Sequence, residues 1–325
     1  MSKYIITGAA GFIASRTAQK LLDAGHEVLG IDNLNDAYDV RMKEHRLKGL
    51  VNQPGFQFLK LDISQKEDIH LLAQKMDGAA AVFNLAARAG VRASVENPWA
   101  FYETNTIGTL NLLELCLAHA IPKFILASTS SIYGLNAPQP TPESADSSHP
   151  LQPYAASKKA AETLAYSYHY LHGIDVTVFR YFTVYGPAGR PDMVMFRFIQ
   201  WIAEGRPVRL NGDGSQSRGF TYVDDIADGT ILGLKPVGYE IINLGGHQVM
   251  TIQSLIEMIE EYLDKKASLE MHPFHKADML TNLADVSKAN SLLSWKPKMN
   301  LEDGVRRAVE WYLAERSWVS QVNTD

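Results

Sequence analysis

Short apolar segments alternate with helical segments through the first half of the chain, and this alternation constrains the fold more than any other feature. Strands joined by single helices form βαβ units, so we expect an α/β fold with a doubly wound parallel sheet covered by helices on both faces. The predicted strands are YIIT, EVLGID, FQFLKLD, AVFNLA, KFILAS and VTVFRY. The predicted helices lie near residues 11–24, 66–75, 98–119 and 153–172.

The second half of the chain is organised differently. After Tyr181 come YGPAGRPDM, a loop rich in proline and glycine, and the turn-rich segment LNGDGSQSRGF. Amphipathic helices are predicted near residues 252–265 and 301–315. We therefore expect residues 1–180 to form the larger domain, with some later segments returning to it. Residues 181–325 are expected to form a smaller, mixed α/β lobe over the carboxyl ends of the strands.

Composition limits the kinds of binding partner and the cellular compartment that we expect for this protein. The 325 residues carry a net charge of -5, so we expect no nucleic-acid partner. No apolar run approaches the roughly 20 residues of a membrane-spanning helix, which predicts no membrane partner. One cysteine, Cys116, leaves no intramolecular disulfide to form and favours a cytoplasmic location.

The segment ITGAAGFIA joins the first predicted strand to the first helix. Gly8 allows a tight turn, Gly11 lets the backbone approach a pyrophosphate, and Ala14 supplies a third small residue at the helix–sheet contact. The helix N-terminus, with Phe12 and Ile13, would then face the phosphates. Small residues also suit any tight β–α junction, so this pattern alone does not establish a dinucleotide site. With the predicted sheet it indicates a Rossmann-type dinucleotide site.

Two further strand ends carry acidic residues. Asp32 ends EVLGID, followed by Asn33, and its carboxylate can accept hydrogen bonds from an adenosine ribose. Because a carboxylate repels a 2′-phosphate, NAD is expected rather than NADP. Asp62 ends FQFLKLD beside a predicted adenine pocket, where Ile63 could pack on the ring. An ordinary helix N-cap is an equally good interpretation of Asp62.

The segment YAASK places Tyr154 and Lys158 one helical turn apart. A tyrosine, with an ordinary pKa of about 10, needs a nearby positive charge to act as a base near neutrality. Lys158 could supply that charge, and Thr129, at the end of a strand, could hold a substrate oxygen. A solvent-facing Tyr–Lys pair is the alternative, and the spacing alone favours it.

Over essentially its whole length the chain resembles the extended short-chain dehydrogenase/reductase family of NAD-dependent epimerases and dehydratases. The matching segments are TGAAGFI, NLAA, NTIGTLNLLE, SSIYG, YAASK, YGP and FTYVDDIA, in the family's order and spacing. The resemblance implies that Tyr154 and Lys158 are the catalytic pair and Thr129 their hydroxyl partner. It also implies further cofactor contacts, namely Leu85, Ala86, Ala87, Asn105, Ser128 and Tyr181. The family often dimerises through two helices, which here are NTIGTLNLLELCLAHA and YAASKKAAETLAYSYHYL.

Within this family the chain resembles the UDP-glucuronate 4-epimerase branch, in GIDNLNDAYDVRMKEHRL, ARAGVRASVENP and YFTVYGPAGRPDM. Ser130 and Ser131 stand where dehydratases carry an acidic pair, which disfavours dehydration. The resemblance implies epimerisation between UDP-glucuronate and UDP-galacturonate through a 4-keto sugar. A UDP-glucuronate decarboxylase and a UDP-glucose/galactose-type 4-epimerase remain alternatives, and a non-catalytic nucleotide sensor is a third.

A uronate substrate brings a carboxylate that a cation or an array of N–H donors has to hold. Arg190 is the leading candidate, helped by the backbone around Gly90, Val91 and Arg92; a solvated loop arginine is the alternative. The resemblance adds Arg218 at the diphosphate, for which a salt bridge to Asp224 or Asp225 is the alternative. The other predicted substrate contacts are Thr129, Ser130, Ser131, Thr183, Phe196 (equally a core aromatic) and Asp278. No metal-ligand spacing is present in the sequence, so no metal is expected.

Overall fold

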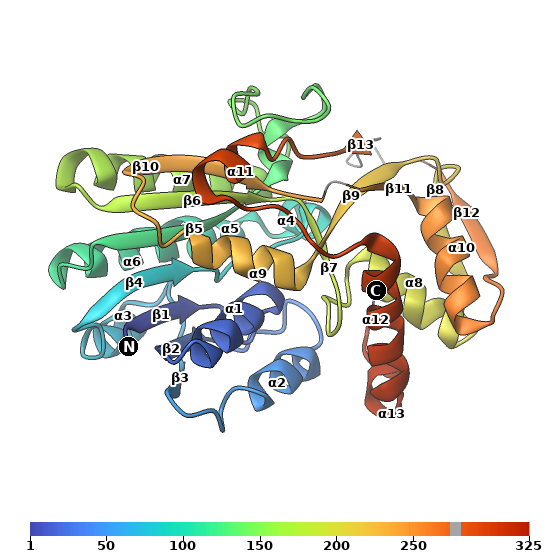
Figure 1. Ribbon diagram of the computed structural model, residues 1–325, viewed down its shortest axis with the longest axis horizontal. Coiled ribbons are helices and arrows are strands. Elements are labelled where there is room, and N and C mark those ends of the chain that lie inside the picture. The colour runs from blue at the N-terminus through green and yellow to red at the C-terminus, as the bar shows by residue number, and fades with distance from the viewer. Residues whose placement is uncertain (247, 274–280, 325) are drawn as a thin grey trace.

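The computed structural model describes residues 1–246, 248–273 and 281–324. These residues form a large lobe built on a seven-stranded sheet and a smaller lobe beside it (Figure 1). The strand order is β10-β6-β5-β4-β1-β2-β3, and every neighbouring pair is parallel. The strands are β1 (Lys3–Thr7), β2 (Glu27–Asp32), β3 (Phe56–Lys60), β4 (Ala79–Asn84), β5 (Lys123–Thr129), β6 (Asp175–Tyr181) and β10 (Tyr239–Leu244). The predicted doubly wound α/β fold is confirmed.

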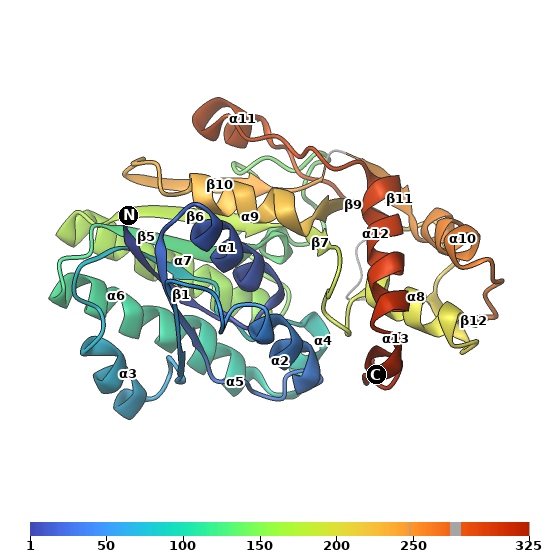
Figure 2. The ribbon, with the colours of Figure 1, turned by 60° about the horizontal axis from the view of Figure 1, so that its bottom comes forward.

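Helices cover both faces of this sheet because its central strands are apolar on both sides (Figure 2). One face packs against α1 (Phe12–Asp23), α9 (Val223–Leu232) and α11 (Ser287–Leu293). The other packs against α3 (Lys66–Ala73), α6 (Gly108–Ala118) and α7 (Pro153–His172). At the carboxyl ends of the strands lie three short helices: α2 (Val40–Lys48), α4 (Val91–Glu96) and the 3-10 helix η2 (Ser130–Tyr133).

The helix expected near residues 98–119 is interrupted. It consists of α5 (Pro98–Tyr102), a π-helical turn η1 (Glu103–Ile107) and α6. The hydroxyl of Thr109 donates to the Asn105 carbonyl at 2.6 Å, and the Asn105 side chain is buried within the turn. A π turn inserts an extra residue into a helix, and such turns are frequent at functional sites.

The smaller lobe has its own apolar core, formed between α8, α10 and α12 and the strands beside them. Its elements are β7 (Thr183–Tyr185), α8 (Val194–Ala203), β8 (Val208–Asn211), β9 (Ser217–Tyr222), β11 (Val249–Thr251), α10 (Ile252–Leu263), β12 (Leu269–His272), β13 (Thr281–Asn282), α12 (Leu301–Ala314) and α13 (Arg316–Val319). After residue 180 the chain also returns to the large lobe, since β10 pairs with β6 and α9 packs on α1. We propose that residues 1–180, together with these returning segments, form one domain, and that the rest of residues 181–325 form the other.

In the part of the chain that the structure describes, no helix is both long enough and apolar enough to cross a membrane.

Candidate active site

A cavity of about 340 Å³ lies at the carboxyl ends of the strands of the large sheet, near the neighbouring strands β1 and β4, where the strand order reverses. It also reaches the smaller lobe. In doubly wound sheets ligands bind at this switch in strand order. The cavity wall is drawn from the glycine turn, the end of β5, the start of α7 and the segment after β6. Predicted site residues in this wall are Gly8, Gly11, Phe12, Ile13, Leu85, Ala87, Gly90, Val91, Ser128, Thr129, Ser130, Ser131, Tyr154, Lys158, Tyr181, Thr183 and Arg190.

The glycine turn leads directly into α1. Gly8 has a φ of 71°, and the Gly11 N–H donates to the Gly8 carbonyl at 2.7 Å, which closes the turn. A side chain at Gly11 would meet the Gly8 oxygen at 2.8 Å, so the turn has room only for glycine there. The first turn of α1 carries no acidic residue. Its N–H groups and partial positive charge therefore suit the pyrophosphate of a dinucleotide.

A second cavity, of about 80 Å³, continues from the glycine turn toward the ends of β2 and β3. Asp32, Asn33, Asp62, Ile63 and Ala86 line it. The Asp32 carboxylate accepts hydrogen bonds from the backbone N–H of Ala10 at 3.1 Å and of Leu34 at 2.8 Å, which orients it at the cavity.

Asp62 stays ionised at the edge of the same cavity. Burial raises the pKa of Asp62, but hydrogen bonds from Ser64 and from the Asn33 amide, the latter at 2.7 Å, outweigh burial and leave the pKa below its usual value. Asp62 also accepts the backbone N–H of Ser64, two residues ahead, in a turn that precedes α3, whose N-cap residue is Gln65. The N-cap interpretation of Asp62 is therefore wrong, and its contact with an adenosine stays a prediction. The carboxylates of this cavity can accept hydrogen bonds from the hydroxyl groups of an adenosine ribose. The N–H groups at the glycine turn and at the start of α1 can donate to a pyrophosphate.

Tyr154, Lys158 and Thr129 meet in the larger cavity. Burial raises the pKa of the Tyr154 phenol, while a hydrogen bond with Thr129 and the positive charge of Arg190 oppose that rise. Burial lowers the pKa of Lys158 to about 8, and the Glu162 carboxylate opposes this shift. The Lys158 ammonium group donates to the Ala127 carbonyl at 2.9 Å. A phenol, a hydroxyl and a lysine in one apolar-walled cavity can move a proton to or from a substrate hydroxyl.

Asn105 lies behind the cavity and is 1% exposed. Its amide donates to the Arg88 carbonyl at 3.0 Å and to the Ser157 hydroxyl at 2.9 Å, and its oxygen accepts the Arg88 N–H at 2.9 Å. These bonds tie the loop after β4 to α7. The structure therefore places Asn105 as a brace between two walls of the cavity.

Arg190 lies between the two cavities and lines both. Its guanidinium donates to both carboxylate oxygens of Asp192, at 3.0 and 2.5 Å, and to the Ala89 carbonyl at 3.2 Å. The Tyr38 ring lies 5.7 Å from its guanidinium carbon. Arg190 is therefore a partly buried, paired arginine in the cavity wall and not a solvated one.

The remaining predicted contacts lie elsewhere. Phe196 is buried in the core of the smaller lobe against Trp311 and Tyr312, which agrees with the core alternative. Arg218, on β9, donates to the Ser217 carbonyl, while Asp224 pairs with Arg16. Arg92 is on α4, and Asp278 lies outside the described residues.

The Tyr181 hydroxyl is turned away from nearby catalytic groups. It bonds with Thr230 on α9 at 2.8 Å, so that only part of Tyr181 lines the cavity.

Sequence reasoning missed Arg46, a buried cation beside the glycine turn. Arg46, on α2, donates to the carbonyls of Ala10, Ala188 and Gly189 and to the Tyr38 hydroxyl. It thereby links the glycine turn to the loop that carries Arg190. The only signal in the sequence was the segment GIDNLNDAYDVRMKEHRL, which pointed to a branch of the family and not to these contacts.

Asn282 was also missed, because its cavity position depends on a distant strand. It lines the larger cavity from β13, and its amide donates to the Ser130 hydroxyl at 3.2 Å.

Residues 4–245 match the NAD dependent epimerase/dehydratase family. A UDP-glucuronate 4-epimerase from Thermodesulfobacterium geofontis is 52% identical over 312 residues, which is 96% of each chain. Among solved structures, UDP-glucuronic acid 4-epimerase from Bacillus cereus, in complex with UDP-glucuronic acid and NAD, is 35% identical with a TM-score of 0.90, covering 96% of this chain and 99% of that one. UDP-glucose 4-epimerase from Thermotoga maritima, with UDP-glucose, is 30% identical with a TM-score of 0.87, covering 97% and 99%.

Proposed function

Because the chain belongs to the NAD dependent epimerase/dehydratase family, we propose that it is a UDP-glucuronate 4-epimerase. It interconverts UDP-glucuronate and UDP-galacturonate through a 4-keto sugar. The observation that carries the proposal is the single cavity in which Tyr154, Thr129 and Lys158 face a glycine turn on one side and Arg190 on the other. Its similarity to the T. geofontis and B. cereus proteins favours the uronate substrate.

The residues around the glycine turn would hold NAD. Gly8 and Gly11 would form the turn at the pyrophosphate, the N-terminus of α1 would supply N–H donors to it, and Asp32 would accept hydrogen bonds from the adenosine ribose. When bound, NAD supplies a hydride acceptor and donor for C4 of the sugar, so the cofactor is regenerated in each cycle. The protein then has to move one proton. It also has to keep the sugar nucleotide in the cavity while the 4-keto sugar turns to present the opposite face of C4.

Tyr154 is the group that takes the proton from the 4-hydroxyl and returns it. Thr129, which hydrogen bonds with Tyr154, would also hydrogen bond with this substrate oxygen. Because burial raises the pKa of Tyr154, the phenol depends on nearby positive charge to ionise. Arg190 already supplies such charge in the protein itself.

The C6 carboxylate of a uronate would meet Arg190 and the hydroxyl groups of Ser130, Ser131 and Thr183, all in the cavity wall. Asp192 forms an ion pair with Arg190. A uronate carboxylate would therefore have to share the guanidinium with Asp192 or replace it. Holding this carboxylate also matters because a 4-keto uronate is a β-keto acid and can lose CO2.

The test is product analysis of the purified, NAD-loaded protein incubated with UDP-glucuronate. We expect UDP-galacturonate to form without an added oxidant. A folded, NAD-loaded protein that releases CO2 and a UDP-pentose instead would be a decarboxylase, and faster turnover of UDP-galactose would indicate a neutral-hexose epimerase. If no product forms, the proposal is wrong.

We also infer that the protein is a homodimer. Large apolar side chains are exposed on α5 and α7, which pack side by side: Trp99 is 76% exposed, Tyr170 76% and Leu171 68%. Exposed large apolar side chains on two neighbouring helices support an interface that includes these helices. Light scattering after size exclusion should give about twice the 36.1 kDa chain mass, and a Trp99→Glu variant should shift it toward the monomer.

A cytoplasmic location is a further inference. It is supported by the single cysteine, Cys116, whose buried thiol needs no oxidising compartment. Cell fractionation of the native host tests it.

A further inference from the structure

Three consecutive residues at the end of β5 each meet a residue of one face of α7. The Ala127 carbonyl accepts from Lys158 at 2.9 Å, the Ser128 hydroxyl donates to Glu162 at 2.6 Å, and Thr129 hydrogen bonds with Tyr154. Tyr154, Lys158 and Glu162 are spaced four residues apart, so they lie on one side of the helix. Glu162 therefore extends the catalytic face by one more turn into the protein.

Glu162 is held there by a buried ion pair. Arg180 on β6 donates to its two carboxylate oxygens at 2.9 and 2.7 Å, and the two residues are 1% and 2% exposed. Arg180 is the register partner of Ser128 on the neighbouring strand, so both point to the same side of the sheet. Burial of two charges is costly, and this arrangement satisfies them with several further bonds.

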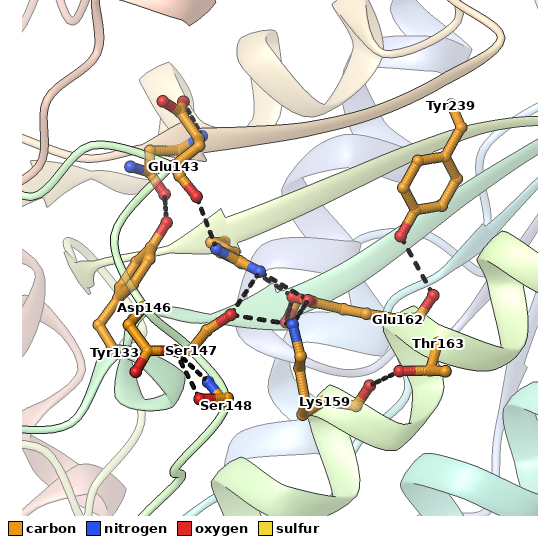
Figure 3. Close-up of polar contacts among 12 residues, drawn as sticks. Tyr133, Glu143, Asp146, Ser147, Ser148, Lys159, Glu162, Thr163 and Tyr239 are labelled. Atoms are coloured by element: carbon orange, nitrogen blue, oxygen red, sulfur yellow. Dashed lines mark hydrogen bonds and ion pairs between the residues drawn. The ribbon is translucent and has the colours of Figure 1, made fainter.

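Figure 3 shows the surroundings of the pair, with Lys159 beside Glu162 on α7 and the loop of Ser147 facing them. Lys159 lies 3.6 Å from the carboxylate and donates to the Ser147 hydroxyl at 2.9 Å. The Tyr133 ring covers Arg180 at 4.8 Å, and Tyr239 donates to the Glu162 carbonyl at 3.1 Å. The carboxylate is thus contacted from α7, β5 and β6, and Ser147 in the loop before α7 contacts two of its partners, Lys159 and Arg180.

The Glu162 carboxylate lies one helical turn from Lys158 on the same face of α7, where its negative charge can favour the ammonium form. Burial favours the neutral amine, and the group that opposes it is Glu162. The other titratable or charged groups around this part of the fold are Tyr154 and Lys159 on α7, Arg180 and Tyr181 on β6, Tyr133 on η2, Tyr239 on β10, and Glu143 and Asp146 in the loop before α7. The carboxylate in this region whose charge favours the ammonium form of Lys158 is that of Glu162.

We propose that Glu162, fixed by Arg180 and Ser128, is a positioning residue that keeps Lys158 as an ammonium ion one helical turn from Tyr154. The inference rests on the epimerase function proposed above and adds a group that sets the alkaline limit of its activity. Glu162 touches neither substrate nor cofactor, and it acts only through Lys158 and Ser128.

A purely structural ion pair is the competing explanation, and the fold offers a matched control for it. At the opposite end of the same two strands, Lys123 pairs with Asp175 across β5 and β6. Asp175→Asn also removes the carboxylate of an ion pair between β5 and β6, but this pair lies far from the cavity.

The experiment compares the pH dependence of kcat for wild type, Glu162→Gln and Asp175→Asn on UDP-glucuronate. Glutamine keeps the size and can still accept the Ser128 hydrogen bond, but it carries no charge. Lys158 then loses its proton at lower pH, so the alkaline limb of the profile should move to lower pH by about 1 unit. Asp175→Asn should leave the limb in place. A folded Glu162→Gln protein whose limb coincides with that of wild type would overturn the proposal, as would an equal shift in Asp175→Asn.

Glu162→Gln leaves Arg180 unpaired, and the single variant could fail to fold for that reason. The double variant Glu162→Gln/Arg180→Met removes both charges, and a smaller shift in the same direction is expected of it, because loss of the Arg180 positive charge partly offsets loss of the carboxylate. An unshifted limb in the folded double variant would likewise refute the role of Glu162.

A second measurement needs no activity. A lysine with a folded pKa of about 8 contributes stability that is present above its unfolded value, about 10.4, and is lost as pH falls through the folded pKa. The destabilisation caused by Glu162→Gln should therefore be larger at pH 7 than at pH 10, and this difference should shrink in a Lys158→Met background. A difference that is unchanged in that background would contradict the inference. A wild type that makes no UDP-galacturonate refutes the proposed function alone, since this measurement still decides the role of Glu162.

Discussion

Replacing Gly8 by alanine should damage the protein in two separable ways. Gly8 follows β1 and has a φ of 71°, a conformation that L side chains rarely adopt. A Cβ at this position would also lie 2.8 Å from the backbone N and Cα of Ala86, which follows β4. Ala86 has little freedom to retreat, because its N–H donates to the Thr7 hydroxyl at 3.1 Å.

The two costs can be worked out separately. The left-handed conformation costs an alanine about 1–2 kcal/mol relative to glycine. The backbone contact adds an overpacking cost of about 1–3 kcal/mol, because atoms of the main chain have to move. Gly25 is the matched control, since it has a φ of 80° but nothing within 4 Å of its Cβ position. We therefore expect a loss of about 2–5 kcal/mol for Gly8→Ala and about 1–2 kcal/mol for Gly25→Ala.

The assay is urea unfolding of both variants, with the NAD released from each purified protein measured in parallel. Gly8→Ala should also hold less NAD, because displacing Ala86 disturbs both cavities where they meet the glycine turn. Gly25→Ala should hold as much NAD as wild type. Equal stability losses in the two variants, together with equal NAD contents, would refute the reasoning about the turn.

Four other outcomes are expected. Tyr154→Phe should lower kcat by about 10²–10⁴-fold while substrate binding by calorimetry persists, and near-normal turnover would exclude Tyr154 as the proton acceptor. Arg190→Ala should lose about 10–100-fold in kcat/KM on UDP-glucuronate and distinctly less on UDP-glucose, because a charge-assisted bond is removed only for the uronate; equal losses would argue against a carboxylate contact. Burial raises the pKa of the Cys116 thiol to about 12, so a thiol reagent at pH 8 should label it only as the protein unfolds, and rapid labelling of folded protein would contradict this packing. Thr251 accepts the Ser254 N–H at 3.0 Å as the N-cap of α10, so Thr251→Ala should cost about 1 kcal/mol in urea unfolding and Thr251→Ser much less, and no difference between them would exclude the cap.

The doubly wound fold was predictable because its signals are local. Strand and helix periods are written in neighbouring residues, and the helix expected near residues 153–172 is α7, Pro153–His172. The turn at Gly8 and the spacing of Tyr154 and Lys158 are local in the same sense. Given the fold, parallel strands bring their carboxyl ends together, which is why Asp32, Asp62 and Thr129 lie at one edge of the sheet.

The sequence by itself therefore determined the fold class and the chemistry brought to that edge, whereas the tertiary structure decided the partner of each charged or polar group. Arg190 was recognisable as a cation in a loop, but its pairing with Asp192 and its place between two cavities depend on how that loop packs. The amide of Asn105 is engaged by Arg88 and Ser157, and Phe196 packs into the core of the smaller lobe. The buried Glu162–Arg180 ion pair joins a helix to a strand, and the periodic patterns of the sequence do not predict this pairing. A local pattern carries a period and a residue type, but the energy of a buried charge depends on partners that folding brings from distant parts of the chain.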